Sequence, residues 1–131
     1  MKDIQDNVLL ANVEIPIFKI VLNIAIGETC EEAMSCSENL HEALSVWSDW
    51  ENTDAAYVYH KKRNIHAIVI SEEATIGTIA HECFHAVMTT LQLKGIKYSQ
   101  KSEEAFAYTI GYLTDKVSEL KQQYDERSKE L

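Results

Sequence analysis

The sequence has little proline and glycine: Pro16 is the single proline, and there are four glycines among 131 residues. This scarcity excludes collagen-like repeats and flexible Pro/Gly-rich linkers between domains. No internal repeat or low-complexity tract divides the chain. We therefore expect residues 1–131 to form a single globular domain, because this is an ordinary length for one domain and 46% of the residues are hydrophobic.

Long apolar segments are also missing. No run approaches the roughly 20 apolar residues that a membrane-spanning helix needs. Charged residues interrupt the first residues, which lack the apolar segment of a signal peptide. The three cysteines, Cys30, Cys36 and Cys83, are an odd number without a secretion signal, which is typical of reduced thiols. These features predict a cytoplasmic protein that does not bind membranes.

Basic residues are few, with 12 Lys and Arg against 21 Asp and Glu and a net charge of −9. Phosphate backbones and anionic lipids bind to basic surfaces, so nucleic acid is not expected as a partner. The acidic balance itself indicates a well-solvated surface.

The hydrophobic pattern predicts an α+β fold. β-branched residues fill Val13–Gly27, which is interpreted as a strand near Phe18–Ile26 or an amphipathic segment. Apolar residues at helical spacing predict a helix over Glu28–Trp50. Two β-rich runs, Ala55–His60 and Ile65–Ile70, flank the polar turn KKRN and predict a hairpin.

Two further helices are expected in the second half of the chain. The first is Thr75–Lys94, with an apolar stripe and with Gly95 as the C-terminal cap; the stripe comprises Ile76, Ala80, Phe84, Val87 and Leu91. The second runs from Ser99 to about Arg127, and Ser99 or Ser102 caps its start. Its apolar stripe comprises Phe106, Ile110, Leu113, Val117, Leu120 and Tyr124. The predicted domain is a small sheet of about three strands packed against these two helices.

The first of these helices carries the sequence His81-Glu82-Cys83-Phe84-His85. Residues four apart lie on the same face of a helix, so the two imidazoles can bind one metal ion. Glu82 lies about 100° further around the helix, where it can act as a general base on a metal-bound water. Two histidines with this spacing also occur by chance on helices. We expect them at the edge of the apolar stripe, where a metal would offset the cost of burying them.

A catalytic zinc ion needs a third protein ligand. No third histidine follows the motif in the residues AVMTTLQLKG, but the next helix opens with KSEEAFAY, and eighteen residues separate His85 from Glu104. This pattern resembles the gluzincin branch of the zincin metallopeptidases, and also small HExxH proteins of tailed phages and bacteria. The resemblance covers Ile65 to Leu113. It implies His81, His85 and Glu104 as zinc ligands and Glu82 as the base.

Two other residues of the last helix are relevant to this site. Glu103 is an alternative third ligand, although a carboxylate at a helix N-terminus also stabilises the helix dipole. Glu104 is preferred because it shares a face with Ala107 and Gly111, which permit close approach of another helix. Tyr108 lies one turn after Glu104 and is a candidate catalytic donor to an oxyanion, or a residue that positions a ligand histidine.

The expected function is a zinc-dependent metallopeptidase that hydrolyses a peptide or protein substrate, with Glu82 as general base. Two alternatives remain open. The chain is either a catalytically silent protein that binds metal for regulation or partner binding, or a structural helix pair without metal. The substrate and the oligomeric state do not follow from the sequence.

Overall fold

The computed structural model describes residues 7–16, 18–37, 40 and 52–129. Within these ranges the chain forms four strands and three helices, which is an α+β arrangement. In chain order they are β1 (Leu9–Ile15), β2 (Ile20–Gly27), α2 (Cys30–Ser35), β3 (Ala55–His60), β4 (Ile65–Ser71), α4 (Ile76–Leu93) and α5 (Glu103–Lys129). The predicted hairpin is confirmed as β3 and β4. Of the helix predicted over Glu28–Trp50, α2 is described, and residues 38–39 and 41–51 lie outside the described residues.

The strands form one mixed sheet in the order β1-β2-β4-β3. β2 and β4 are parallel, whereas β1 with β2 and β3 with β4 are antiparallel. β4 is a central strand, and its residues from His66 to Ser71 are all buried, as expected when helices cover both faces. β3 and β1 are therefore the edges of the sheet.

β1 is a fourth strand, where the sequence predicted about three. The β-rich run Val13–Gly27 is divided by a turn after Ile15, in which Lys19 adopts a φ of +52°. Pro16 also lies in this turn and cannot donate a ladder hydrogen bond. The residues before the turn fold back on β2, so that Val13 pairs with Leu22. The hairpin was not predicted, because β-branched residues on both sides of the turn read as one segment.

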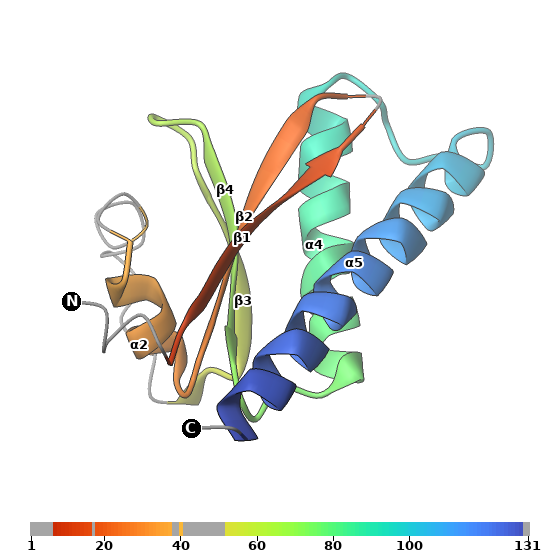
Figure 1. Cartoon of the computed structure of the whole chain (residues 1–131). Helices are drawn as coiled ribbons and strands as arrows, with labels where there is room; N and C mark the ends of the chain where they lie inside the picture. Colours follow the sequence, from red (N-terminus) through yellow and green to blue (C-terminus); the bar gives the residue numbers. More distant parts are fainter. Residues whose placement is uncertain (1–6, 17, 38–39, 41–51, 130–131) are drawn as a thin grey trace.

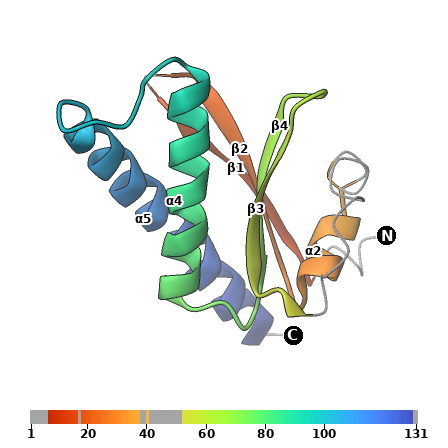
Figure 2. The same cartoon turned by 180° about the vertical axis from the view of Figure 1, so that it is seen from behind.

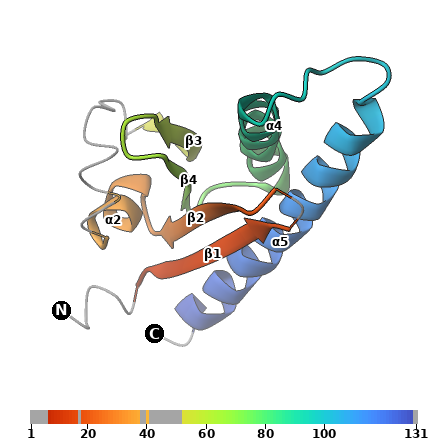
Figure 3. The ribbon, with the colours of Figure 1, turned by 90° about the horizontal axis from the view of Figure 1, so that it is seen from above.

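Helices cover both faces of the sheet, with α4 and α5 on one face and α2 on the other (Figures 1 and 3). The larger core lies under α4 and α5 and joins the isoleucines of β2 and β4 to Val87 and Leu113. A smaller core lies under α2 and includes Met34. The helix α2 approaches β2 closely because Gly27 has no side chain: a Cβ there would lie 3.0 Å from the backbone nitrogen of Ala33.

The bounds of α4 agree with the predicted helix over Thr75–Lys94. The Thr75 side chain caps the start by accepting a hydrogen bond from the Thr78 N–H at 3.2 Å. Gly95 follows the last turn with a φ of +85°, a conformation that favours glycine. Seen from behind, α4 runs alongside β3 (Figure 2).

The predicted apolar stripe of α4 is only partly right. Val87 and Leu91 are fully buried, but Ile76 is 70% exposed and Phe84 is 45% exposed. The buried face instead comprises Ile79, Cys83, Ala86, Val87, Thr90 and Leu91. A face that includes a cysteine and two small or polar residues is hard to recognise from hydrophobicity alone. His81 and His85 consequently lie on the exposed side of the helix rather than at the edge of its buried face.

α5 begins at Glu103, four residues later than predicted, and Ser102 accepts the N–H of Phe106 through its backbone oxygen. The predicted core stripe is confirmed at Phe106, Leu113, Val117 and Tyr124, which are all buried.

α5 also reaches the edge of the sheet. Tyr112 donates its hydroxyl to the backbone oxygen of Glu14 at 3.3 Å, and Arg127 donates to that of Val8 at 2.6 Å. These bonds satisfy backbone groups along β1 that would otherwise be available to another strand.

The two long helices cross and diverge toward the loop that joins them (Figures 1 and 3). They are antiparallel neighbours, so the first turn of α5 lies toward the C-terminal end of α4. None of the three helices among the described residues is long and apolar enough to cross a lipid bilayer.

Candidate functional site

His81 and His85 lie next to each other on the exposed surface of α4. Their Nε2 atoms are 3.2 Å apart, and the two rings meet edge to face at 74°. Two nitrogen ligands of a tetrahedral zinc ion, each at about 2.0–2.1 Å from the metal, are about 3.3–3.4 Å apart. The two imidazole nitrogens therefore have the separation that two ligands of one zinc ion require.

Glu82 points from α4 toward the edge strand β3. Its Oε1 accepts a hydrogen bond from the backbone N–H of Tyr57 at 2.7 Å, and its Oε2 lies 3.8 Å from Nε2 of His81. An edge strand carries N–H groups without a partner strand, and the carboxylate satisfies this one. Glu82 is thus fixed with one oxygen on β3 and the other beside the histidine pair.

A hollow of about 640 Å³ lies between the start of β3 and α4. Four residues of α4 line it at steps of four, three and four, namely Thr78, Glu82, His85 and Thr89. Tyr57 lines the opposite wall. The candidate base and one of the two histidines therefore face a common space that is large enough for part of a peptide.

Tyr57 and His66 form a polar pair next to this hollow that the motif does not contain. The Tyr57 hydroxyl lies 2.9 Å from Nδ1 of His66, whose side chain is buried. Burial raises the pKa of the Tyr57 phenol and lowers the pKa of His66, and nearby Lys94 lowers the latter further. The alternating pattern of AAYVYH could have indicated that Tyr57 and Tyr59 share one face of β3.

The candidates on α5 lie on a different surface. Glu104 and Tyr108 line a shallow hollow together with Ala107, Gly111 and Asp115, and Tyr108 is 75% exposed. Glu103 accepts a hydrogen bond from the hydroxyl of Tyr98 at 3.3 Å. Within the part of the chain that the structure describes, no three His, Cys, Asp or Glu side chains are grouped to hold a metal ion. Glu104 and Tyr108 therefore stay predictions as site residues.

Helix geometry explains this separation. The thiol of Cys83 lies beside Thr114 of α5, so this side of α4 faces α5. His81 and His85 are each two residues from Cys83, which places both about 200° around the helix. In addition, α4 continues for eight residues after His85, about 12 Å along the axis, before the chain turns toward Glu104. The small residues Ala107 and Gly111 do not bring Glu104 to α4, because their side of α5 faces outward.

Cys83, at a variable position of the motif, packs in the larger core. It is fully buried, and desolvation raises its pKa to about 11. A thiol with this pKa stays protonated and is a poor nucleophile or metal ligand at neutral pH. The chemistry of this segment is thus confined to its imidazoles and its carboxylate.

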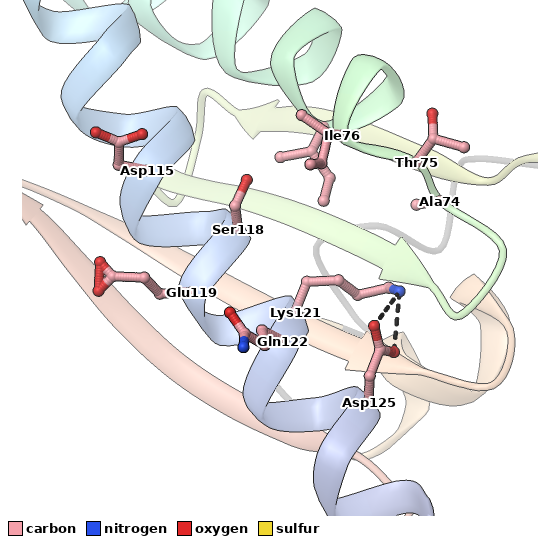
Figure 4. Close-up of a pocket in the computed structure, with 10 residues that line it drawn as sticks. Ala74, Thr75, Ile76, Asp115, Ser118, Glu119, Lys121, Gln122 and Asp125 are labelled. Carbon is pink, nitrogen blue, oxygen red and sulfur yellow. Dashed lines mark hydrogen bonds and ion pairs between the residues drawn. The ribbon is translucent and has the colours of Figure 1, made fainter.

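Another hollow, of about 670 Å³, lies between the start of α4 and the second half of α5 (Figure 4). Two of its polar side chains are paired with each other, because Lys121 forms an ion pair with Asp125 at 3.0 Å. The Ser118 hydroxyl is buried and has no hydrogen-bond partner among the described residues. None of the lining side chains is a histidine, so this hollow is not the candidate metal site.

Comparisons of the chain with protein families, with curated proteins and with solved structures found no match. The assignment of chemistry to this site therefore depends on its own geometry. The residues fit a zinc ion as far as the two imidazoles are concerned, because their nitrogens have the separation that zinc requires. The carboxylate expected from α5 does not join them in this arrangement.

Proposed function

We propose that the protein is a zinc-dependent hydrolase, and specifically a peptidase of the zincin type that acts on peptide or protein substrates. The observation that carries the proposal is the 3.2 Å separation of the two Nε2 atoms on an exposed helix face. Two imidazole nitrogens this close form an N–H···N hydrogen bond without metal. A zinc ion would replace this bond by binding both Nε2 atoms, with the ring proton of each histidine on Nδ1. His81 and His85 would hold the ion, and Glu104 is the third ligand that the resemblance to gluzincins implies.

Zinc, when bound, supplies a water of lowered pKa and polarises a carbonyl group. Glu82 would be the general base beside that water, taking up a proton and returning it to the leaving amine. The proton would reside on Oε2, because Oε1 is engaged by the N–H of Tyr57. This same bond restrains the carboxylate, so the base does not lose its orientation when substrate enters the hollow.

The test compares Glu82→Gln with the wild-type protein on a peptide library, with and without zinc. We expect the variant to keep one zinc ion and to lose about 10²–10⁴-fold in cleavage rate, because only the base is removed. Glu119→Gln, at an exposed position of α5, is the matched control and should cleave normally. Undiminished, chelator-sensitive cleavage by Glu82→Gln would overturn the role given to Glu82.

A second function is favoured by one specific observation. Glu82 already makes a structural bond to β3, and the α5 carboxylates lie elsewhere in the described structure. A zincin-like protein that binds metal for regulation or partner binding has both properties. Zinc uptake by the wild-type protein without cleavage of any library peptide would favour this function over the peptidase.

A further inference from the structure

A second polar hollow, which we call the basic hollow, lies where the starts of β2 and β4 meet the C-terminal end of α4. It encloses about 440 Å³, and its polar lining consists of Lys19, Tyr59, Asn64, His66 and Lys94. Three of these side chains are basic and none is acidic. This lining is unexpected in a chain whose net charge is −9.

The charges of the surrounding loops have the same sign. Seven of the twelve basic residues lie in the three connections at this end of the sheet: Lys19, Lys61, Lys62, Arg63, Lys94, Lys97 and Lys101. At the opposite end, the carboxylates of Glu28, Glu31 and Asp54 line a separate hollow. Charges of one sign around a concave surface raise the local concentration of ligands of the opposite sign. The basic hollow is thus placed where the field of the protein favours anions.

His66 is the buried donor of the basic hollow. The side chain is only 6% exposed, and the ring of Tyr59 stacks on it with the centroids 4.5 Å apart. Because Tyr57 remains a neutral phenol, its hydroxyl can donate to Nδ1 of His66 at 2.9 Å. When the Tyr57 hydroxyl donates, the proton of the neutral imidazole is on Nε2, at the far side of the ring from Tyr57. Stacking and this hydrogen bond restrain the ring, which lines the basic hollow.

Two ammonium groups and an imidazole N–H are all donors, so they suit a ligand group that offers several acceptor oxygens. One opposing contribution is present, because the C-terminal end of α4 carries the negative end of the helix dipole. A single lysine at this position would only compensate that dipole, whereas Lys19 comes from a different loop and adds a second charge. We propose that the basic hollow binds an anionic group, a phosphate or a carboxylate, of a small ligand.

The experiment follows the ring resonances of His66 by NMR while metal-free protein is titrated at low ionic strength. The probes are inorganic phosphate, pyrophosphate and acetate, which separate phosphate from carboxylate recognition. We expect a saturable shift of His66 with at least one probe. Lys19→Gln combined with Lys94→Gln should lower the affinity at least about tenfold, since charge-assisted hydrogen bonds are lost.

The matched control is Lys61→Gln combined with Lys62→Gln, which removes the same charge from the hairpin turn outside the basic hollow. This control should change the affinity by less than about threefold, because exposed charges act mainly through a screened field. The proposal is overturned if none of the probes gives a saturable shift, or if the control weakens binding as much as the Lys19 and Lys94 changes do. Thermal melts of both double variants would establish that they are folded.

Discussion

The two long helices contribute to the candidate site in different ways. On α4, His81 and His85 bring their Nε2 atoms to 3.2 Å, and Glu82 is hydrogen-bonded to the neighbouring strand. On α5, Glu104 and Tyr108 lie on an outward face. The short distance between the two histidines follows from their spacing within one helix, which is fixed by helical geometry. The position of Glu104 and Tyr108 depends on how two helices pack, which spacing along the chain does not determine.

The largest expected effect on stability is the difference between substitutions on the inner and the outer face of α5. Leu113→Ala removes a fully buried side chain from the main core and should lower the free energy of unfolding by about 2–5 kcal/mol. Tyr108→Ala, on the outer face of the same helix, should cost less than about 0.5 kcal/mol. Urea denaturation of both variants measures the difference. Similar losses from the two changes would show that the Tyr108 face is covered in solution.

The next prediction tests whether α5 contributes a ligand to the metal site. If Glu104 is the third zinc ligand, as the resemblance to gluzincins implies, Glu104→Ala should weaken zinc binding at least about tenfold. Glu119→Ala, at an exposed position of α5 that is not a candidate ligand, is the matched control and should leave the affinity unchanged. Zinc titration by calorimetry gives both values. Equal affinity in the Glu104 variant and the wild-type protein would mean that α5 supplies no ligand at this position.

A smaller effect is expected from the helix cap that fixes the start of α4. Thr75 accepts the N–H of Thr78, and Thr75→Ala should lower the free energy of unfolding by about 1 kcal/mol. Thr75→Ser retains the hydroxyl and should restore most of the stability. If alanine and serine variants melt at the same temperature as the wild-type protein, the side-chain cap does not stabilise α4.

The last prediction concerns pH. The pKa of His66 is lowered in the folded protein, so the unfolded chain binds a proton more readily. The contribution of the neutral imidazole to the free energy of unfolding is therefore fully present above about pH 6.5. It is lost as the pH falls below that value. In His66→Gln the free energy of unfolding should fall less steeply below about pH 6.5 than in the wild-type protein. His60→Gln, the control, should behave like the wild-type protein. An equally steep fall in His66→Gln would contradict the burial of a neutral His66.

Local patterns predicted much of the fold. The β3–β4 hairpin, the bounds of α4 and the buried residues of α5 follow from alternation, from caps and from helical periodicity. The hairpin of β1 and β2 does not, because β-branched residues stand on both sides of Pro16 and no Gly, Asn or Asp marks a turn there. The buried face of α4 was also mispredicted, since Cys83, Ala86 and Thr90 contribute to it while the more hydrophobic Ile76 and Phe84 are exposed.

The candidate site was predictable to the same extent. The pairing of two imidazoles on one helix is a local property, and so is the direction of Glu82, about 100° further around the helix. The hydrogen bond of Glu82 to Tyr57 joins residues 25 positions apart in sequence and requires the sheet to be formed. The position of Glu104 relative to the histidines depends on the face that α4 turns toward α5, and this face was assigned incorrectly from hydrophobicity.

The most direct measurement is a calorimetric titration of the metal-free protein with zinc, comparing the wild type with His81→Ala, His85→Ala and the control His60→Ala. Our account predicts one zinc ion per chain, at least about a hundredfold weaker binding in each of the first two variants, and unchanged binding in the control. If the wild-type protein takes up no zinc, or if His85→Ala binds it as tightly, the two histidines are not a metal site.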